Sequence, residues 1–295
     1  MENIRVQPSA QIVRDFWILT KPRLTQLVVL TSLCGAAVAP GSISLLAWIS
    51  LLFGTWGIVA SANMVNCVLE RDVDIYMKRT QERSVILKRV SPGAVLFAGL
   101  ALAILSLVTL KFGNSLLTMN LGALGFISYI ALYTPLKRIS FSALFVGAVP
   151  GAIPPMMGWA AVENALSWGA WILFGILFFW QLPHFIAIAL NRQSEYARAG
   201  FKTLPLEVGE KAAHWHMVLY TGALIVVSLI PYTLNLAGII YFVIALGLGF
   251  LFFGFAVASV LNLRALNWSR MIFFGSLIYL PLVLGGWVAD LFFSR

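Results

Sequence analysis

The sequence predicts an all-helical integral membrane protein that crosses the bilayer nine times. Of its 295 residues, 60% are hydrophobic and only 11% are charged, whereas a soluble domain carries about 25% charged residues. Its apolar runs have about the 20-residue length of a transmembrane helix, which is twice that of the alternating strands of a membrane β-barrel. We therefore expect a single bundle of spanning helices over residues 1–295.

Nine apolar runs are long enough to be spans. The first, 24–40, follows a polar N-terminal segment, and the second, 44–66, ends at an acidic cluster. The third and fourth, 92–112 and 115–133, are so close together that they must form a tight hairpin. The remaining five predicted spans are 142–161, 167–190, 214–232, 236–259 and 270–290.

Basic residues indicate the orientation of these spans. With the N-terminus in the cytoplasm, 18 of the 20 Lys and Arg residues lie inside, and only Lys111 and Arg295 lie outside. Cytoplasmic loops are rich in Lys and Arg, so we expect the N-terminus inside and the C-terminus outside. The net charge of +9 follows from this topology and requires no nucleic-acid partner. The predicted inside segments are 1–23, 67–91, 134–141, 191–213 and 260–270.

The N-terminal segment and the cysteines bear on the compartment. The first 23 residues lack the acid-poor, Arg- and Ser-rich composition of a transit peptide, and the first apolar run lacks a signal-peptide cleavage pattern. We therefore expect a multi-pass protein of the bacterial inner (plasma) membrane. Cys34 and Cys67 form no Cys-x-x-Cys pair, so neither a disulfide nor a metal–thiolate site is expected.

Acidic residues are concentrated in the two longest predicted cytoplasmic loops, which hold 7 of the 11 Asp and Glu residues. Asn66, Glu70 and Asp74 are spaced by four residues, so they line one face if the second span continues as a helix, and Asp72 then points away. Such a row of oxygen ligands suits Mg²⁺, which binds one or two carboxylates together with substrate phosphates. The alternative interpretation is a solvated helix end whose acids are balanced by neighbouring cations.

Basic residues beside the acids favour the metal interpretation. The segment MKRTQER places Arg79 and Arg83 four residues apart directly after Asp74. Lys137 and Arg138 form a second basic site on the same predicted face of the membrane. A metal that bridges phosphate oxygens and Arg side chains that bind them in a bidentate manner are what a diphosphate group requires.

The second charged loop repeats the pattern of the first. Asn191 and Glu195 have the same four-residue spacing as Asn66 and Glu70, again where a helix leaves the membrane, and Arg198 follows them. Two acid clusters with Mg²⁺ and several cations would stabilise a diphosphate as a leaving group. A diphosphate substrate that is met inside a membrane is an isoprenyl diphosphate, whose tail would lie among apolar helices and whose allylic cation aromatic side chains would shield. We therefore expect both loops to form an active site.

Four motifs resemble those of a known family. NCVLERDVDIYMKRTQER resembles an Asn-x-x-x-Asp-x-x-x-Asp motif with a basic tail, and FWQLPHFIAIALNRQSEYARAGFKTLP resembles a second acidic motif. Together with YTPLKR and GAVPGAIPPMMGWAA, they resemble the UbiA-type intramembrane prenyltransferases, and within them the branch that farnesylates heme b. The likeness runs from about residue 21 to the last span. Glu70 and Glu195 stand where most members have Asp, and Ser84 stands where Pro is usual.

The resemblance implies a UbiA-like helical bundle and a reaction. Farnesyl diphosphate would ionise, the allylic cation would alkylate a vinyl group of heme b, and water would add to give heme O for heme–copper oxidases. Heme b is then a substrate and Mg²⁺ the cofactor, with a heme A synthase or an oxidase assembly factor as a possible partner. The metal and catalytic residues would be Asn66, Glu70, Asp74 and Glu195. The diphosphate-binding residues would be Arg79, Arg83, Lys137, Arg138, Asn191 and Arg198, although Lys137 and Arg138 could instead contact heme propionates.

His184 is a candidate heme contact. It follows Pro183 deep in an apolar span, where a polar residue is by default a functional candidate. Gln181 lies one helical turn away. His184 would ligate the heme iron or position the porphyrin by a hydrogen bond. The alternative is a packing histidine satisfied by a neighbouring carbonyl.

Two other functions compete with this prediction. A quinone or aromatic-acid prenyltransferase would share the acidic motifs and differ around His184 and the GAIPPMMGW segment. A transporter would carry acidic residues near the middle of the membrane. None of the predicted spans has Asp, Glu, Lys or Arg clearly at its centre, which argues against transport.

Overall fold

The computed structural model describes residues 9–261 and 267–293. The first eight residues of the predicted N-terminal segment, residues 262–266 of the predicted 260–270 connection, and Arg295 lie outside the described residues. Every regular element in the described part is a helix. In chain order they are α1 (Ser9–Leu19), α2 (Pro22–Val38), α3 (Leu45–Leu69), η1 (Asp74–Tyr76), α4 (Gln81–Arg89), α5 (Pro92–Gly113), α6 (Leu116–Ile127), η2 (Ser128–Tyr133), α7 (Thr134–Leu136), α8 (Ala143–Glu163), α9 (Trp168–Asn191), α10 (Gln193–Arg198), α11 (Leu204–Val208), α12 (Glu210–Thr233), α13 (Ile239–Leu261) and α14 (Trp268–Phe293).

Eight of the predicted spans are confirmed as helices long and apolar enough to cross a membrane. They are α3, α5, the continuous run from α6 through η2 to α7, α8, α9, α12, α13 and α14. The first predicted span is α2, which has only 17 residues. At 1.5 Å per residue it is about 26 Å long, slightly less than the apolar thickness of a bilayer. That α2 crosses the membrane, and with it the count of nine and the orientation, stays a prediction.

Local sequence accounts for several helix ends. The Ser44 hydroxyl caps α3 by accepting a hydrogen bond from the backbone N–H of Ala47. The Ser115 hydroxyl caps α6 in the same way through the N–H of Thr118. Such side-chain oxygens satisfy N–H groups that have no partner within the helix. Because only two residues separate α5 from α6, these helices form the expected hairpin.

The centre of the bundle is held by close contact between α2 and α8. A Cβ placed on Gly158 would lie 1.8 Å from the carbonyl oxygen of Ser32, and one on Gly35 would lie 2.1 Å from that of Pro155. Small residues at helix crossings allow such backbone approach, which is a common way to pack helices in membranes. The main apolar core extends from this crossing through α9 to α12, α13 and α14.

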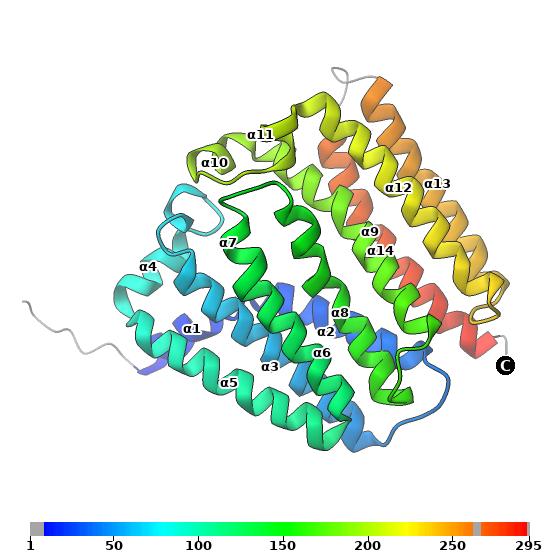
Figure 1. Cartoon of the computed structure of the whole chain (residues 1–295), viewed down its shortest axis with the longest axis horizontal. Coiled ribbons are helices and arrows are strands. Elements are labelled where there is room, and N and C mark those ends of the chain that lie inside the picture. Colours follow the sequence, from blue (N-terminus) through cyan, green and yellow to red (C-terminus); the bar gives the residue numbers. More distant parts are fainter. Residues whose placement is uncertain (1–8, 262–266, 294–295) are drawn as a thin grey trace, which may run out of the picture.

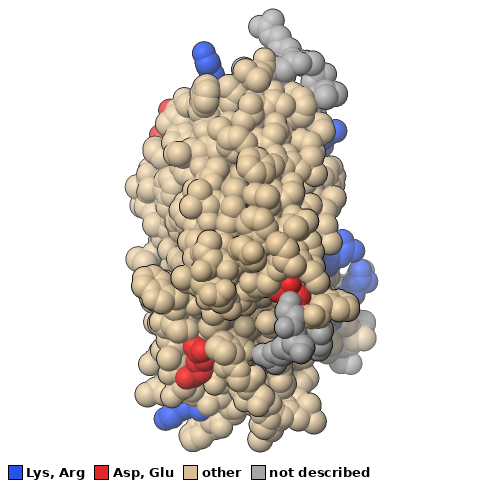
Figure 2. All heavy atoms as spheres, turned by 90° about the vertical axis from the view of Figure 1, so that its right-hand side faces the viewer, with Lys and Arg blue, Asp and Glu red and all other residues tan. Residues whose placement is uncertain are grey.

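The charged connections gather at one end of the bundle. Figure 1 shows α4, α7, α10 and α11 on the same side, toward the upper-left ends of the long spans. The outer surfaces of the spans are apolar, and Figure 2 shows a face of the molecule that neutral side chains cover almost completely. Exposed residues such as Phe97 and Phe112 contribute to this apolar surface, which suits contact with lipid. Most of the charged connections therefore lie at one end, while Glu163 and Asp290 lie near the other end of the bundle.

Candidate active site

The first acidic cluster lies where α3 ends. The predicted continuation of this helix through Asp74 is wrong, because α3 ends at Leu69 and Asp74 begins the short helix η1. The helical hydrogen bonds nevertheless persist, since Glu70 N–H donates to Asn66 O and Asp74 N–H donates to Glu70 O, each at 2.9 Å. Asn66, Glu70 and Asp74 are all buried. The turn therefore keeps the predicted spacing even though the regular helix ends.

Asp72 points away from this cluster, as its spacing predicts. Its carboxylate is exposed and forms a bidentate pair with the Arg138 guanidinium at 2.8 Å for both contacts. Hydrogen bonding from Arg138 holds the pKa of Asp72 below its ordinary value. Arg138 also donates to the carbonyl of Leu69 at 3.3 Å, so it ties α7 to the end of α3. Its predicted contact with diphosphate or propionate stays a prediction.

A lysine that the sequence analysis did not select enters the cluster. Nζ of Lys21 donates to Oδ1 of Asn66 at 2.8 Å, and Nδ2 of Asn66 donates to Oγ1 of Thr134 at 3.2 Å. Removal from water lowers the pKa of Lys21 to about 8, although the Cys67 and Glu70 side chains oppose this shift. Only its place directly before the first apolar run, on the predicted cytoplasmic face, could have indicated this role.

Two further cations surround the carboxylates. Lys137 forms an ion pair with Glu70 and lies over the ring of Tyr133, with Nζ 4.7 Å from the ring centroid. Burial lowers the pKa of Lys137, but Tyr133 and Glu70 outweigh it and the pKa rises above its ordinary value. Burial raises the pKa of Asp74, and the charge of the nearby Arg83 opposes that rise. The cluster therefore combines two buried acids with several fixed positive charges.

The second loop departs from the predicted repeat. α9 ends at Asn191, and Glu195 lies in the separate helix α10, where its N–H donates to Arg192 O at 3.0 Å. The expected continuous helical face is therefore wrong. Asn191 is exposed and accepts a hydrogen bond from Ser269 at 2.8 Å, while Arg198 is exposed and donates to its own helix. Nothing among these contacts brings Asn191 or Arg198 to the first cluster.

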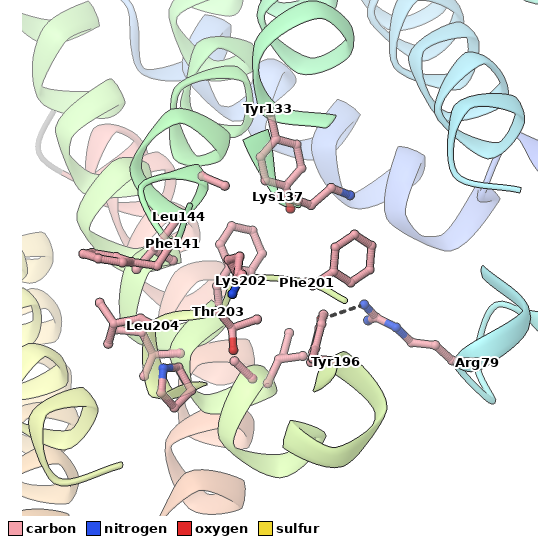
Figure 3. A pocket seen from close by; sticks show the side chains of 16 residues that line it. Arg79, Tyr133, Lys137, Phe141, Leu144, Tyr196, Phe201, Lys202, Thr203 and Leu204 are labelled. Carbon is pink, nitrogen blue, oxygen red and sulfur yellow. Dashed lines mark hydrogen bonds between the residues drawn. The ribbon is translucent and has the colours of Figure 1, made fainter. Parts of the chain in front are cut away.

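Other residues do bring the two loops together. The Arg79 guanidinium donates to the Tyr196 hydroxyl at 3.0 Å, which Figure 3 shows as a dashed line. Beneath this bond, Val73 and Met77 of the first loop pack against Phe201 and its neighbours from the second. The two acidic segments are therefore in contact, although through residues other than the Asn, Asp and Glu of their motifs.

The acidic side chains of the two loops suit a metal ion that takes most of its ligands from water and substrate. No group of three or more His, Cys, Asp or Glu side chains in the described part of the chain is arranged to hold a metal. Oε2 of Glu195 is buried and accepts no hydrogen bond from a described residue. Oε1 of Glu70 is likewise buried, and its only contact of this kind is the ion pair with Lys137. The open Glu195 oxygen, and a Glu70 carboxylate held by a single ion pair, fit Mg²⁺, which keeps waters and phosphate oxygens as most of its ligands.

His184 lies within the bundle and is held on three sides. Its ring stacks between Trp180 and Phe273, with centroids 5.1 Å away on each side. Nδ1 lies 2.6 Å from Oγ of Ser276, and that hydroxyl donates to the carbonyl of Phe273. Because the hydroxyl proton is used there, Nδ1 must carry the proton of a neutral ring and Nε2 is left as an acceptor.

Gln181 is engaged by backbone groups. Its amide donates to the carbonyls of Leu177 at 3.0 Å and Ala148 at 3.4 Å, and the side chain packs closely against Gly151. It therefore braces α9 against α8. A heme contact by Gln181 stays a prediction.

A protein-family model matches most of the chain. The model of the UbiA prenyltransferase family matches residues 28–289, which include both acidic segments and all eight confirmed spans except the C-terminal end of the last. The chain belongs to the UbiA prenyltransferase family. The resemblance seen in the motifs is thereby confirmed, and the helical bundle is a UbiA fold.

Two relatives with similar sequences carry the same name. A relative from Myxococcus xanthus (strain DK1622), named protoheme IX farnesyltransferase, is 42% identical over 278 residues, which are 94% of this chain and 95% of the relative. A relative of the same name from Sorangium cellulosum (strain So ce56) is 41% identical over 248 residues, or 84% of this chain and 87% of that protein.

Solved UbiA structures share the fold at low identity. A structure from work on digeranylgeranylglyceryl phosphate synthase in membranes has a TM-score of 0.81 at 15% identity and covers 95% of this chain and 98% of its own. A UbiA homolog from Archaeoglobus fulgidus bound to DMAPP and Mg²⁺ has a TM-score of 0.70 at 14% identity, with 92% and 98% coverage.

Proposed function

We propose that this chain transfers a farnesyl group from farnesyl diphosphate to a vinyl group of heme b, with addition of water, and so forms heme O and diphosphate. The observation that carries the proposal is the 42% identity, over 94% of the chain, to a protein named protoheme IX farnesyltransferase. The buried acids and cations at one end of the bundle support it, because an ionising diphosphate needs both.

The donor diphosphate would bind at the first acidic cluster. Mg²⁺, held by Glu70, Asp74 and Asn66 with Glu195 from the second loop, would neutralise charge on the leaving group. Arg83 and Lys21 carry positive charge beside the carboxylates and would contact phosphate oxygens. Lys137 would do so from the opposite side while it remains paired with Glu70.

The reaction needs only the two substrates and water. The bond between C1 of the farnesyl group and the diphosphate oxygen breaks, and the electron pair leaves with diphosphate. The terminal carbon of the heme vinyl group then bonds to C1, which moves the positive charge to the vinyl carbon next to the porphyrin ring. Water adds to that carbon and loses a proton, and a hydroxyl group results. Tyr129 and Tyr133 in η2 present aromatic rings beside the acids and would shield the first cation.

The acceptor would lie along α9. Neutral His184 has Nε2 available as an acceptor, so it would either ligate the heme iron or accept a hydrogen bond. Its aromatic neighbours Trp180 and Phe273 fix the ring in one plane. Gln181 would then support the acceptor pocket by holding α8 and α9 together.

The setting of the enzyme is also part of the proposal. We place residues 1–295 as one transmembrane prenyltransferase domain in a bacterial inner membrane, with α2 as the ninth span and the acidic end in the cytoplasm. Reporter fusions at the Gly41 and Asn164 turns, between α2 and α3 and between α8 and α9, would both report an external location. A cytoplasmic signal at either turn would reject this topology. A heme A synthase partner would receive the product.

A single assay tests the activity. Membranes that contain the chain receive heme b, farnesyl diphosphate and Mg²⁺, and the extracted hemes are examined by mass spectrometry. We expect a heme heavier by one farnesyl group and one water. Prenylation of a hydroxybenzoate in the same membranes, with unchanged heme b, would reject the proposal in favour of an aromatic-acid prenyltransferase.

A further inference from the structure

A cavity with positive charge lies next to the carboxylate cluster. It is bounded by the start of α8, the second half of α9 and the segment that joins α10 to α11, and its volume is about 150 Å³. Figure 3 shows Arg79, Lys137 and Lys202 around this space. Its described lining residues include these three cations but no Asp or Glu.

This cavity adjoins the proposed diphosphate site and shares Lys137 with it. Neither Glu70 nor Asp74 lines it, and Lys137 and Tyr133 stand between it and those acids, with Lys137 contacting both regions. A diphosphate bound there would lack the carboxylates that hold its metal ion. The charge of the cavity is therefore better matched to an anion that binds without a metal, such as a carboxylate.

Two hydroxyl groups in the lining have unused hydrogen-bonding capacity. Oγ1 of Thr203 is buried and has no hydrogen-bond partner among the described residues, although a Thr at the start of a helix normally caps it. The Tyr196 hydroxyl accepts a hydrogen bond from Arg79, and its own proton has no acceptor among the described residues. A buried hydroxyl without a partner is costly, so a ligand that supplies oxygen acceptors would stabilise this arrangement.

The remaining walls of the cavity are apolar. Phe141, Leu144, Phe185 and Leu204 line it together with the charged groups. A matching ligand has carboxylates at one edge of an apolar body, and only that edge has to enter the cavity. Heme b has that chemistry, because its two propionates lie on the edge of the porphyrin opposite its vinyl groups.

We propose that this cavity binds the propionates of the acceptor heme, with Lys202 and Thr203 as their principal ligands. The assignment rests on the proposed function, since it takes heme b to be the acceptor. Lys202 is exposed and pairs with Glu207 at 3.1 Å, so its ammonium group can exchange that partner for a propionate at little cost. Its backbone N–H donates to Lys137 O at 2.9 Å, which fixes this segment against the end of α7.

Equilibrium binding tests the cavity without turnover. The purified chain is titrated in detergent with heme b or with its dimethyl ester, in which both propionates are neutral, and binding is followed by absorbance in the absence of farnesyl diphosphate. We expect heme b to bind at least tenfold more tightly than the ester, because charged hydrogen bonds are lost with esterification. Equal affinities would overturn the proposal.

Matched variants identify the residues responsible. Lys202→Gln should weaken heme b binding about tenfold and ester binding by much less, and Thr203→Val should weaken heme b binding about threefold. Glu207→Gln breaks the same ion pair but keeps the lysine, so it should leave heme b affinity unchanged or raise it. An equal loss in Glu207→Gln and Lys202→Gln would assign the effect to loop structure and reject the proposal.

Kinetic measurements distinguish this site from the donor site, and a comparison of binding with turnover tests it independently of the proposed activity. In Lys202→Gln the KM for heme b should rise, while the KM for farnesyl diphosphate stays at its wild-type value. A rise only in the KM for farnesyl diphosphate would place Lys202 in the donor site and overturn the proposal. If the wild type binds heme b in preference to its ester but forms no farnesylated heme, the proposed function fails while the propionate site stands.

Discussion

Lys21 and Asn66 are joined by a 2.8 Å hydrogen bond between side chains 45 residues apart. The bond fixes Oδ1 of Asn66, whose amide nitrogen is held in turn by Thr134. Lys21 has a φ of 51°, a left-handed conformation that is uncommon for a residue other than glycine. The turn between α1 and α2 therefore holds this lysine in an unfavourable backbone geometry while its ammonium group reaches the acidic cluster.

Removal of the Lys21 charge should impair catalysis more than folding. In Lys21→Met the Asn66 amide loses its fixed orientation and the diphosphate loses a cation, so kcat/KM should fall at least tenfold. Arg23→Gln is the matched control, because Arg23 is exposed two residues later and has no ion pair among the described residues. Steady-state heme farnesylation at saturating Mg²⁺ measures both. Equal activity of the two variants would remove Lys21 from the site.

Substitution of each carboxylate in the first loop should distinguish those that hold the metal from the one that does not. Glu70→Gln or Asp74→Asn should lower turnover by at least a hundredfold, because each removes a buried charge that would hold Mg²⁺. Asp72→Asn should retain most of the activity, because this exposed carboxylate faces Arg138. Size-exclusion profiles should show all three proteins folded. Full activity in both Glu70→Gln and Asp74→Asn would mean that the metal assignment is wrong.

Glu195 should affect the metal requirement specifically. Its Oε2 is buried without a hydrogen-bond partner among the described residues, so Glu195→Gln should raise the Mg²⁺ concentration needed for half-maximal activity several-fold. EDTA should abolish wild-type activity, and added Mg²⁺ should restore it. Glu210→Gln is the control, because Glu210 is an exposed acid of the same predicted loop at the start of α12. An unchanged Mg²⁺ dependence in Glu195→Gln would remove this residue from the metal site.

The acidic spacing was predictable because hydrogen bonding along a chain is local. Asn66, Glu70 and Asp74 keep their register through bonds between residues four apart, so the pattern holds even where the regular helix ends. The same argument failed for Asn191 and Glu195, where a break at Arg192 starts a new helix. Spacing alone does not show whether a polar helix end continues or breaks.

Contacts between distant segments could not be obtained from the sequence. The Lys21–Asn66 and Arg79–Tyr196 bonds, the latter across 117 residues, depend on how the spans pack. The pairing of Arg138 with Asp72 is of the same kind, and it occupies a cation that the motif assigns to substrate. The apolar runs, by contrast, are set by the thickness of the bilayer, which is why eight spans were predictable from composition alone.

Gly158 should be required for the crossing of α2 and α8. In Gly158→Ala the added Cβ would lie 1.8 Å from the carbonyl oxygen of Ser32, a backbone atom that cannot move aside without shifting α2. We expect a thermal midpoint in detergent lower by several degrees. Gly254→Ala adds the same methyl group to α13, where no atom lies within 4 Å, and should leave the midpoint unchanged. Identical midpoints in the two variants would contradict the close packing.

His184 allows packing and heme binding to be distinguished. His184→Phe preserves an aromatic ring between Trp180 and Phe273 but removes Nε2. If Nε2 contacts the acceptor, this variant should stay folded while heme farnesylation falls at least tenfold. Ser276→Ala removes the acceptor for the Nδ1 proton, so the ring can adopt the other tautomer, and a smaller loss is expected. A folded His184→Phe protein with wild-type kcat and KM for heme b would show that the histidine only packs, because every contact except those of its nitrogens is retained.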